Sequence, residues 1–116
     1  MRKVKLLIFG GANYLLAPVA AAWDRAGVEL IGPIPSLTEW LAVRDSIVDG
    51  AIIDIDLDTG TLIALSDALE EASIPSLFAT SSPVEPDYRG FELAVRPETI
   101  NAILTALFGT GDLRVH

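Results

Sequence analysis

Apolar and polar positions follow a repeating order along the chain. Short, nearly continuous apolar runs alternate with longer stretches whose apolar positions recur at helical spacing. The short runs have the length of strands, and strands of a parallel sheet covered on both faces have this composition. They predict five strands, at residues 3–9, 28–31, 51–55, 74–79 and 91–95.

Helices are predicted in the stretches that follow the strands. Capping residues, prolines and glycines at their ends give helices opening at residues 14, 36, 58 and 97 and stopping near residues 26, 47, 73 and 109. Pro18 either kinks the first helix or marks its true start, because proline removes an interior hydrogen bond. Residues 81–90, which include Pro83 and Pro86, are predicted to form a loop with at most one helical turn.

Strands and helices in alternation predict an α/β fold. The parallel sheet has right-handed crossovers and helices on both faces. At 116 residues the chain fits one domain, and the arrangement expected at this length is the flavodoxin-like three-layer sandwich with strand order 2-1-3-4-5. The predicted domain covers residues 1–109, and residues 110–116 form a polar tail that we expect to be mobile.

Polar and glycine positions gather where the predicted strands end. Asp54 is the carboxylate at the end of the third strand, Asp56 lies two residues on, and Thr80 follows the fourth strand. The first strand ends in Gly10 and Gly11. Because ligands bind at the carboxyl ends of the strands in open α/β sheets, this edge is the candidate functional site.

In this order, these residues resemble a receiver domain of the two-component response regulators, over nearly the whole chain. The stretches that carry the resemblance are Gly32-Pro33, residues 49–57 and residues 60–69. It implies that Asp54 is the phospho-acceptor, that Thr80 contacts the phosphoryl group, and that Arg96 and Pro97 replace a Lys-Pro pair. The family keeps that bond cis, so a cis bond is expected before Pro97.

The sequence departs from the family at the residues that perform phosphoryl transfer. The two acids that hold Mg²⁺ in receivers fall on Gly10 and Gly11, the lysine becomes Arg96, and the aromatic switch residue becomes Leu93. The fourth helix is expected to be short or missing. These departures predict a degenerate stand-alone pseudo-receiver in phosphorelay signalling, which keeps the fold, binds protein partners and is not an enzyme.

Several roles stay open for the residues of this edge. Two roles are open for Asp56 and Asp58. Either one of them adds a carboxylate that helps Asp54 to hold Mg²⁺, or both only solvate the turn and begin a helix. Thr80 contacts an anion or a nearby backbone group. Gly10 and Gly11 form a small anion or nucleotide site, or glycine replaces acids that are no longer needed.

Arg96 also has two interpretations. Its guanidinium either pairs with Asp54, which would lock one signalling conformation, or points to solvent.

The composition of the chain limits the kinds of partner and the location that we expect for the protein. A net charge of -8 and a pI near 4.4 oppose nucleic-acid binding. The chain has no cysteine, no apolar stretch long enough to span a membrane and no recognisable export signal, so we expect a cytoplasmic protein. No cofactor is expected, and Mg²⁺ only if Asp54 is phosphorylatable. The resemblance implies a histidine kinase, phosphotransfer protein or downstream effector as partner.

The first predicted helix is unusually apolar. It forms a docking or homodimer surface, or it is buried against the last helix.

Overall fold

The computed structural model describes residues 4–43, 48–81 and 90–109. Strands and helices alternate as the sequence predicts. In chain order they are β1 (Val4–Phe9), α1 (Ala17–Arg25), β2 (Val28–Ile34), α2 (Leu37–Val43), β3 (Gly50–Asp54), α3 (Thr59–Glu71), β4 (Ser76–Thr80), β5 (Phe91–Glu92) and α4 (Pro97–Phe108). The end of the second predicted helix, most of the proline-containing loop with its short or missing helix, and the tail at 110–116 lie outside the described residues.

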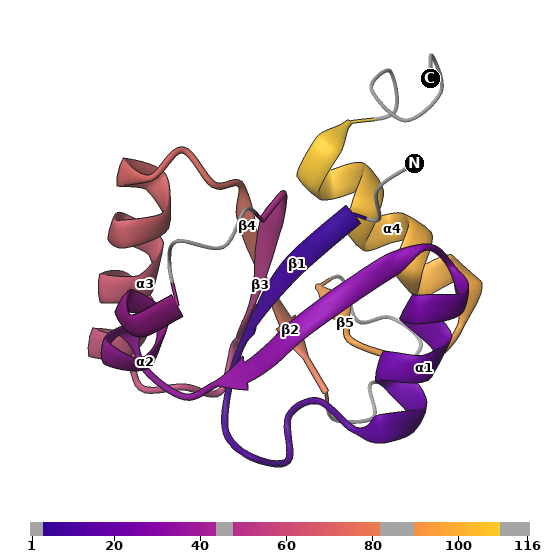
Figure 1. Ribbon diagram of the computed structural model, residues 1–116, viewed down its shortest axis with the longest axis horizontal. Helices are drawn as coiled ribbons and strands as arrows, with labels where there is room; N and C mark the ends of the chain where they lie inside the picture. Colours follow the sequence, from indigo (N-terminus) through magenta and orange to yellow (C-terminus); the bar gives the residue numbers. More distant parts are fainter. Residues whose placement is uncertain (1–3, 44–47, 82–89, 110–116) are drawn as a thin grey trace.

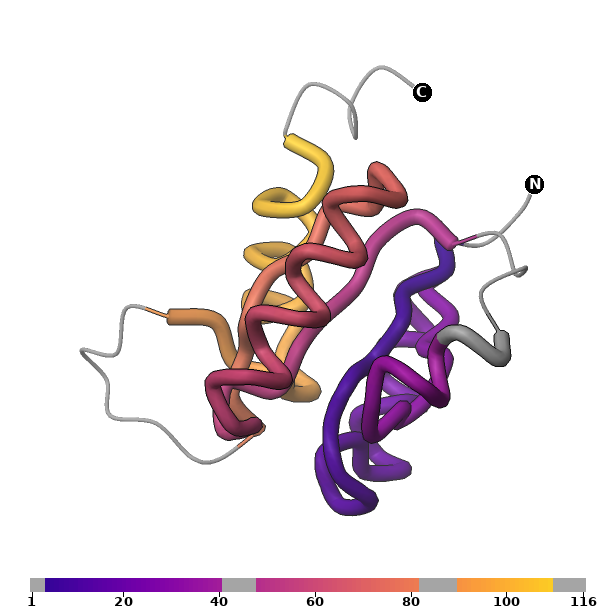
Figure 2. The backbone as a smooth tube through the Cα atoms, turned by 90° about the vertical axis from the view of Figure 1, so that its left-hand side faces the viewer, coloured from indigo at the N-terminus to yellow at the C-terminus, as the bar shows by residue number. Residues whose placement is uncertain are grey.

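The five strands form one parallel sheet in the order β2-β1-β3-β4-β5, which confirms the predicted topology. Helices α1 and α4 lie on one face of the sheet, and α2 and α3 lie on the other (Figure 1). Figure 2 turns the second face towards the viewer and shows α3 and α2 in front of the strands. The parallel order brings the carboxyl ends of β1, β3 and β4 to one edge, the lower edge in Figure 1.

The central strands are buried on both faces, which is why they read as continuous apolar runs. Alternate residues of β1 and β3 enter two separate cores. One core combines them with Trp23 of α1 and Ile103 of α4, and the other combines them with Trp40 of α2 and with Leu65 and Leu69 of α3. The large apolar side chains of α1 are therefore buried in the same core as those of α4, as in the second of the two interpretations of this helix.

Strand β2 is longer than predicted. It runs through Gly32 and Pro33 to Ile34, and its register against β1 shifts between Leu7 and Phe9. Gly32 makes this possible because it adopts a φ of 142° and because a Cβ there would lie 2.5 Å from the carbonyl oxygen of Ile8. Gly32, which directly follows the predicted strand, instead lies within β2 and allows a close approach between two strands.

The last strand is shorter than predicted and ends at Glu92. The Leu93 amide still donates to the Thr80 carbonyl at 2.8 Å, and the carbonyl of Ala94 accepts from the indole of Trp23 at 3.2 Å. The backbone that follows β5 is thus held by a side chain of α1.

The helix starts follow their capping signals. Helix α1 begins at Ala17 with Pro18 in its first turn, so Pro18 marks the true start of the helix. The Ser36 hydroxyl accepts the Glu39 amide at 3.2 Å before α2, and Pro97 is the first residue of α4. No helix within the described ranges 4–43, 48–81 and 90–109 is long and apolar enough to cross a membrane.

Candidate functional site

The carboxyl edge of the sheet brings together most of the residues predicted for the site. Asp54 is the last residue of β3 and lies opposite Ala79 of β4, and Thr80 is the last residue of β4. Gly10 directly follows β1, which is the other neighbour of β3. The adjacency expected for Asp54, Thr80 and Gly10 is therefore present.

Tyr14 is the residue of this edge that the sequence interpretation missed. The sequence pattern predicts that it belongs to the first helix, but it lies in the loop between β1 and α1 and is only 3% exposed. Its hydroxyl donates to the carbonyl of Ala79 at 2.7 Å, and the Ile55 amide donates to the same oxygen at 3.2 Å. Tyr14 therefore joins the first loop to the ends of β3 and β4.

The ring of Tyr14 explains the glycine at position 10. A Cβ built on Gly10 would lie 2.6 Å from Cγ and Cδ2 of Tyr14 and 2.7 Å from its Cβ. These atoms form the base of the tyrosine side chain, so turning the far end of the ring cannot relieve the clash. Any side chain at position 10, including aspartate, is excluded while Tyr14 keeps its place.

The second glycine has no such constraint. Gly11 is exposed, and a Cβ there would meet nothing within 4 Å. The Gly10 amide donates to the carbonyl of Ile34 at 2.9 Å, and α1 begins only at Ala17. Because one amide is engaged and no helix starts directly after the glycines, this geometry gives an anion or nucleotide site there no support.

Asp54 closes the turn that follows β3. Its Oδ1 accepts the Asp56 amide at 2.9 Å, and its carbonyl accepts the Leu57 amide at 3.2 Å. The Asp54 side chain is half-buried, whereas Asp56 is exposed. In the described part of the chain, no three His, Cys, Asp or Glu residues are grouped so that they could hold a metal ion.

Asp58 has a local structural role. It is the N-cap of α3, where its Oδ1 accepts the Thr61 hydroxyl at 2.7 Å and its Oδ2 accepts the Thr61 amide at 3.0 Å. Of the two interpretations of Asp58, the one in which it begins a helix agrees with these contacts. The hydrogen bond from the Thr61 hydroxyl, followed by that from the Thr61 amide, holds the pKa of Asp58 below its ordinary value of 3.8.

Replacing Asp58 with alanine is expected to lower the melting temperature at neutral pH, because α3 loses its cap. A carboxylate whose pKa is lower in the folded state than in the unfolded state stabilises the folded protein, and this contribution is complete only at a pH above the pKa of the unfolded state. The part of this loss that depends on the charge of Asp58 should therefore be fully present above pH 3.8, and the loss should shrink as the pH falls through the lower folded pKa. Thermal unfolding of the wild type and the variant across the acid range measures the loss of stability. Asp56→Ala is the control, because it removes an exposed aspartate that is not the N-cap of α3. A difference that does not shrink in acid would contradict this account of the cap.

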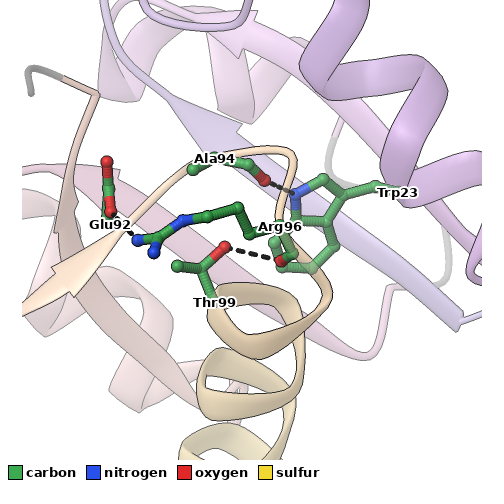
Figure 3. Close-up of polar contacts among 5 residues, drawn as sticks. All are labelled: Trp23, Glu92, Ala94, Arg96 and Thr99. Atoms are coloured by element: carbon green, nitrogen blue, oxygen red, sulfur yellow. Dashed lines mark hydrogen bonds and ion pairs between the residues drawn. The ribbon is translucent and has the colours of Figure 1, made fainter.

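Arg96 does not contact Asp54, so the first of its two interpretations is wrong. Its Nη2 lies 2.8 Å from Oε1 of Glu92, and its side chain is 57% exposed (Figure 3). The Arg96 carbonyl accepts the Thr99 hydroxyl at 2.8 Å, and the Trp23 indole donates to the Ala94 carbonyl at 3.2 Å. Arg96 therefore belongs to the connection between β5 and α4, where a nearer carboxylate engages it.

The expectation of a cis bond before Pro97 is also wrong. Among the described residues, the cis peptide bond is Gly32-Pro33. Arg96 has the extended φ and ψ of an N-cap, -73° and 138°, and Pro97 is the first residue of α4. A trans bond suits a proline at that position, where its missing amide hydrogen leaves no helical acceptor unpaired.

Thr80 is 7% exposed and lies opposite Glu92 of β5. Its predicted contact with a phosphoryl group or another anion stays a prediction.

Comparison with known proteins supports the fold. No protein-family model matches the sequence, and no curated protein matches it. Among solved structures, the crystal structure of the response regulator PhyR from Brucella abortus superposes with a TM-score of 0.65 at 21% sequence identity. The match covers 98% of this chain and 52% of that chain, so this chain spans about half the length of its structural neighbour. The flavodoxin-like, receiver-type fold is thereby confirmed.

Proposed function

We propose that this chain is a single-domain, response-regulator-like protein of a phosphorelay that acts by binding proteins, with Mg²⁺-dependent phosphorylation of Asp54 impaired. Its partner would be a histidine kinase, a phosphotransfer protein or a downstream effector, in the cytoplasm. The proposal is supported by the structural likeness to a response regulator and by the position of Asp54 at the end of β3.

The observation that carries the proposal is the ring of Tyr14 against Gly10. Transfer of a phosphoryl group to a carboxylate brings anions together, so it depends on a divalent cation and fixed positive groups. Mg²⁺ is usually held by one or two carboxylates and water. The first of the two family acid positions cannot accept a side chain beside Tyr14, and the second is also glycine.

The positive group expected at this site is engaged elsewhere. Arg96 pairs with Glu92 rather than with Asp54. One oxygen of Asp54 is occupied by the Asp56 amide. Asp54 is therefore bound into a turn, and among the described residues neither Gly10 nor Gly11 supplies an acid and Arg96 does not supply a cation to it.

The alternative keeps phosphorylation and uses Asp56 as the second metal ligand. The Asp56 carboxylate is exposed and lies next to Asp54 in the same turn. In that case Asp54 and Asp56 would hold the ion with water as the remaining ligands.

Incubation with acetyl phosphate and Mg²⁺, followed by intact mass spectrometry, distinguishes these functions. We expect no phosphoryl adduct on the wild type and no rise in melting temperature on adding Mg²⁺, because the ion has too few ligands. A phosphorylatable receiver treated in parallel shows that the reagent is active. An adduct on the wild type that is absent from Asp54→Asn would show that Asp54 accepts a phosphoryl group and would contradict the proposal.

A further inference from the structure

Phe78 is exposed although it lies inside the sheet. It is the middle residue of β4, which has a strand on each side, yet it is 40% exposed. In the register it lies opposite Ile53 of β3, so both side chains point to the face that α2 and α3 cover. Ile53 is fully buried in the core of that face, and no apolar residue that the structure describes in β4 or β5 belongs to this core. The helices on this face therefore cover β1 and β3 but leave β4 open.

A groove lies between α3 and this open part of β4. At the start of β4 it is a pocket, lined by Ser66, Asp67, Glu70, Ile74, Pro75 and Ser76. Phe78 extends the β4 side of the pocket, because residues two apart in a strand point to the same face. Ile63, which is 57% exposed, extends the α3 side, because it lies three residues before Ser66 and four before Asp67. Since α3 runs back from the carboxyl edge to the start of β4, both extensions lead the same way. We name this surface, formed by Ile63, Phe78 and the pocket residues, the α3–β4 groove.

The groove has the position of a helix in the repeating order of the fold. Helices follow β1, β2, β3 and β5 and pack on the sheet. After β4, by contrast, the sequence of residues 81–90 predicts a loop, which contains Pro83 and Pro86. A parallel sheet is covered by helices on both faces. A partner strand would not fit, because β4 already pairs with β3 and β5. The occupant with the right shape is therefore a helix.

The charges at the groove are negative. Asp67 and Glu70 line it and are exposed. Residues 59–80, from the start of α3 to the end of β4, contain no lysine or arginine. A basic helix therefore complements the groove in charge. A second copy of this chain fits poorly, because two such grooves facing each other would bring their carboxylates together.

We propose that the α3–β4 groove binds an amphipathic helix of a partner protein and that this helix completes the layer over β4. Its apolar side chains would cover Phe78 and Ile63, and its lysine or arginine side chains would meet Asp67 and Glu70. The inference rests on the proposed function in one respect, that the chain acts by binding proteins. It does not depend on whether Asp54 accepts a phosphoryl group.

The test titrates a fluorescent amphipathic peptide of leucine and lysine with the full chain and follows the anisotropy of the peptide. The wild type should bind it, and Ile63→Gln should weaken binding at least about fivefold, because an exposed isoleucine side chain is lost from the contact. Glutamine is a good helix former and the position is exposed, so the melting temperature of the variant should stay within about 3 °C of that of the wild type. Weaker binding by an equally stable protein cannot result from unfolding.

Matched variants locate the contact. Val95→Thr changes an aliphatic residue that is 48% exposed but lies beside α1, so it should leave binding within about twofold. Glu70→Lys should weaken binding, whereas Glu29→Lys, which makes the same charge change on β2 at the other edge of the sheet, should not. In ¹⁵N NMR spectra, the peptide should shift the amides of Ile63 and Phe78 and leave that of Glu29 in place.

Four results would overturn the proposal: no binding of the leucine peptide, equal binding of a peptide with serine in place of leucine, equal binding by Ile63→Gln, or amide shifts confined to other surfaces. A phosphoryl adduct on Asp54 would instead contradict the proposed function, so the two failures are distinguishable.

Two further experiments test other occupants of the groove. Self-association of the wild type that Ile63→Gln abolishes, measured by sedimentation, would assign the groove to a second copy. Peptide binding that appears only after residues 82–89 are replaced by a glycine-serine linker would assign the groove to that segment of the chain. Either result would overturn the proposal.

Discussion

Replacing Gly10 with alanine is expected to lower the free energy of unfolding by about 2–3 kcal/mol, as overpacking does in a filled core. The added Cβ would lie within 2.7 Å of three atoms at the base of the Tyr14 side chain. Either the loop between β1 and α1 moves, or the ring leaves its site and loses its hydrogen bond to Ala79. Urea denaturation of the variant and the wild type measures the loss.

A double-mutant cycle with Tyr14→Gly tests the cause. The glycine variant of Tyr14 removes the ring and also the Cβ that lies 2.7 Å from the added atom, so adding Gly10→Ala to it should cost little, and the difference measures the coupling of the two sites. Gly11→Ala is the matched control, because its Cβ meets nothing within 4 Å. Equal costs for Gly10→Ala in both backgrounds, or for the two glycines in the wild type, would show that the ring does not exclude a side chain.

Trp23→Ala is expected to have the largest effect on stability, a loss of about 3–5 kcal/mol in the free energy of unfolding. Trp23 is 0% exposed and belongs to the core shared by α1 and α4. Its indole also donates to the Ala94 carbonyl at 3.2 Å, which holds the connection that leads to Arg96 (Figure 3). Urea denaturation at neutral pH measures the change.

Two phenylalanine variants separate packing from the hydrogen bond. Trp23→Phe keeps most of the apolar contact but removes the hydrogen bond that the indole donates to the Ala94 carbonyl. Loss of this bond should lower the free energy of unfolding by about 1 kcal/mol more than the smaller ring alone does. Trp40, whose ring packs edge-on against Phe9 in the other core, is the matched site. If Trp23→Phe cost no more than Trp40→Phe, the hydrogen bond from the Trp23 indole to the Ala94 carbonyl would not stabilise the protein.

The candidate site was predictable in its position but not in its contacts. Asp54 and Thr80 could be placed because each ends an apolar run, and parallel strands end at the same edge. The partner of Arg96 could not be predicted, because the choice between Asp54 and Glu92 depends on the path of the chain between β5 and α4. The bend after Glu92 brings that carboxylate to 2.8 Å from Arg96.

The sequence alone determined the order of strands and helices, their approximate bounds and, through the rules for parallel sheets, the strand order. These depend on hydrophobic periodicity and capping, which act between residues that are close along the chain. Tertiary structure alone decided the role of Tyr14, which reaches a carbonyl 65 residues away and excludes every side chain at Gly10. Close packing acts between residues that the fold brings together, so no local pattern could indicate why that position is glycine.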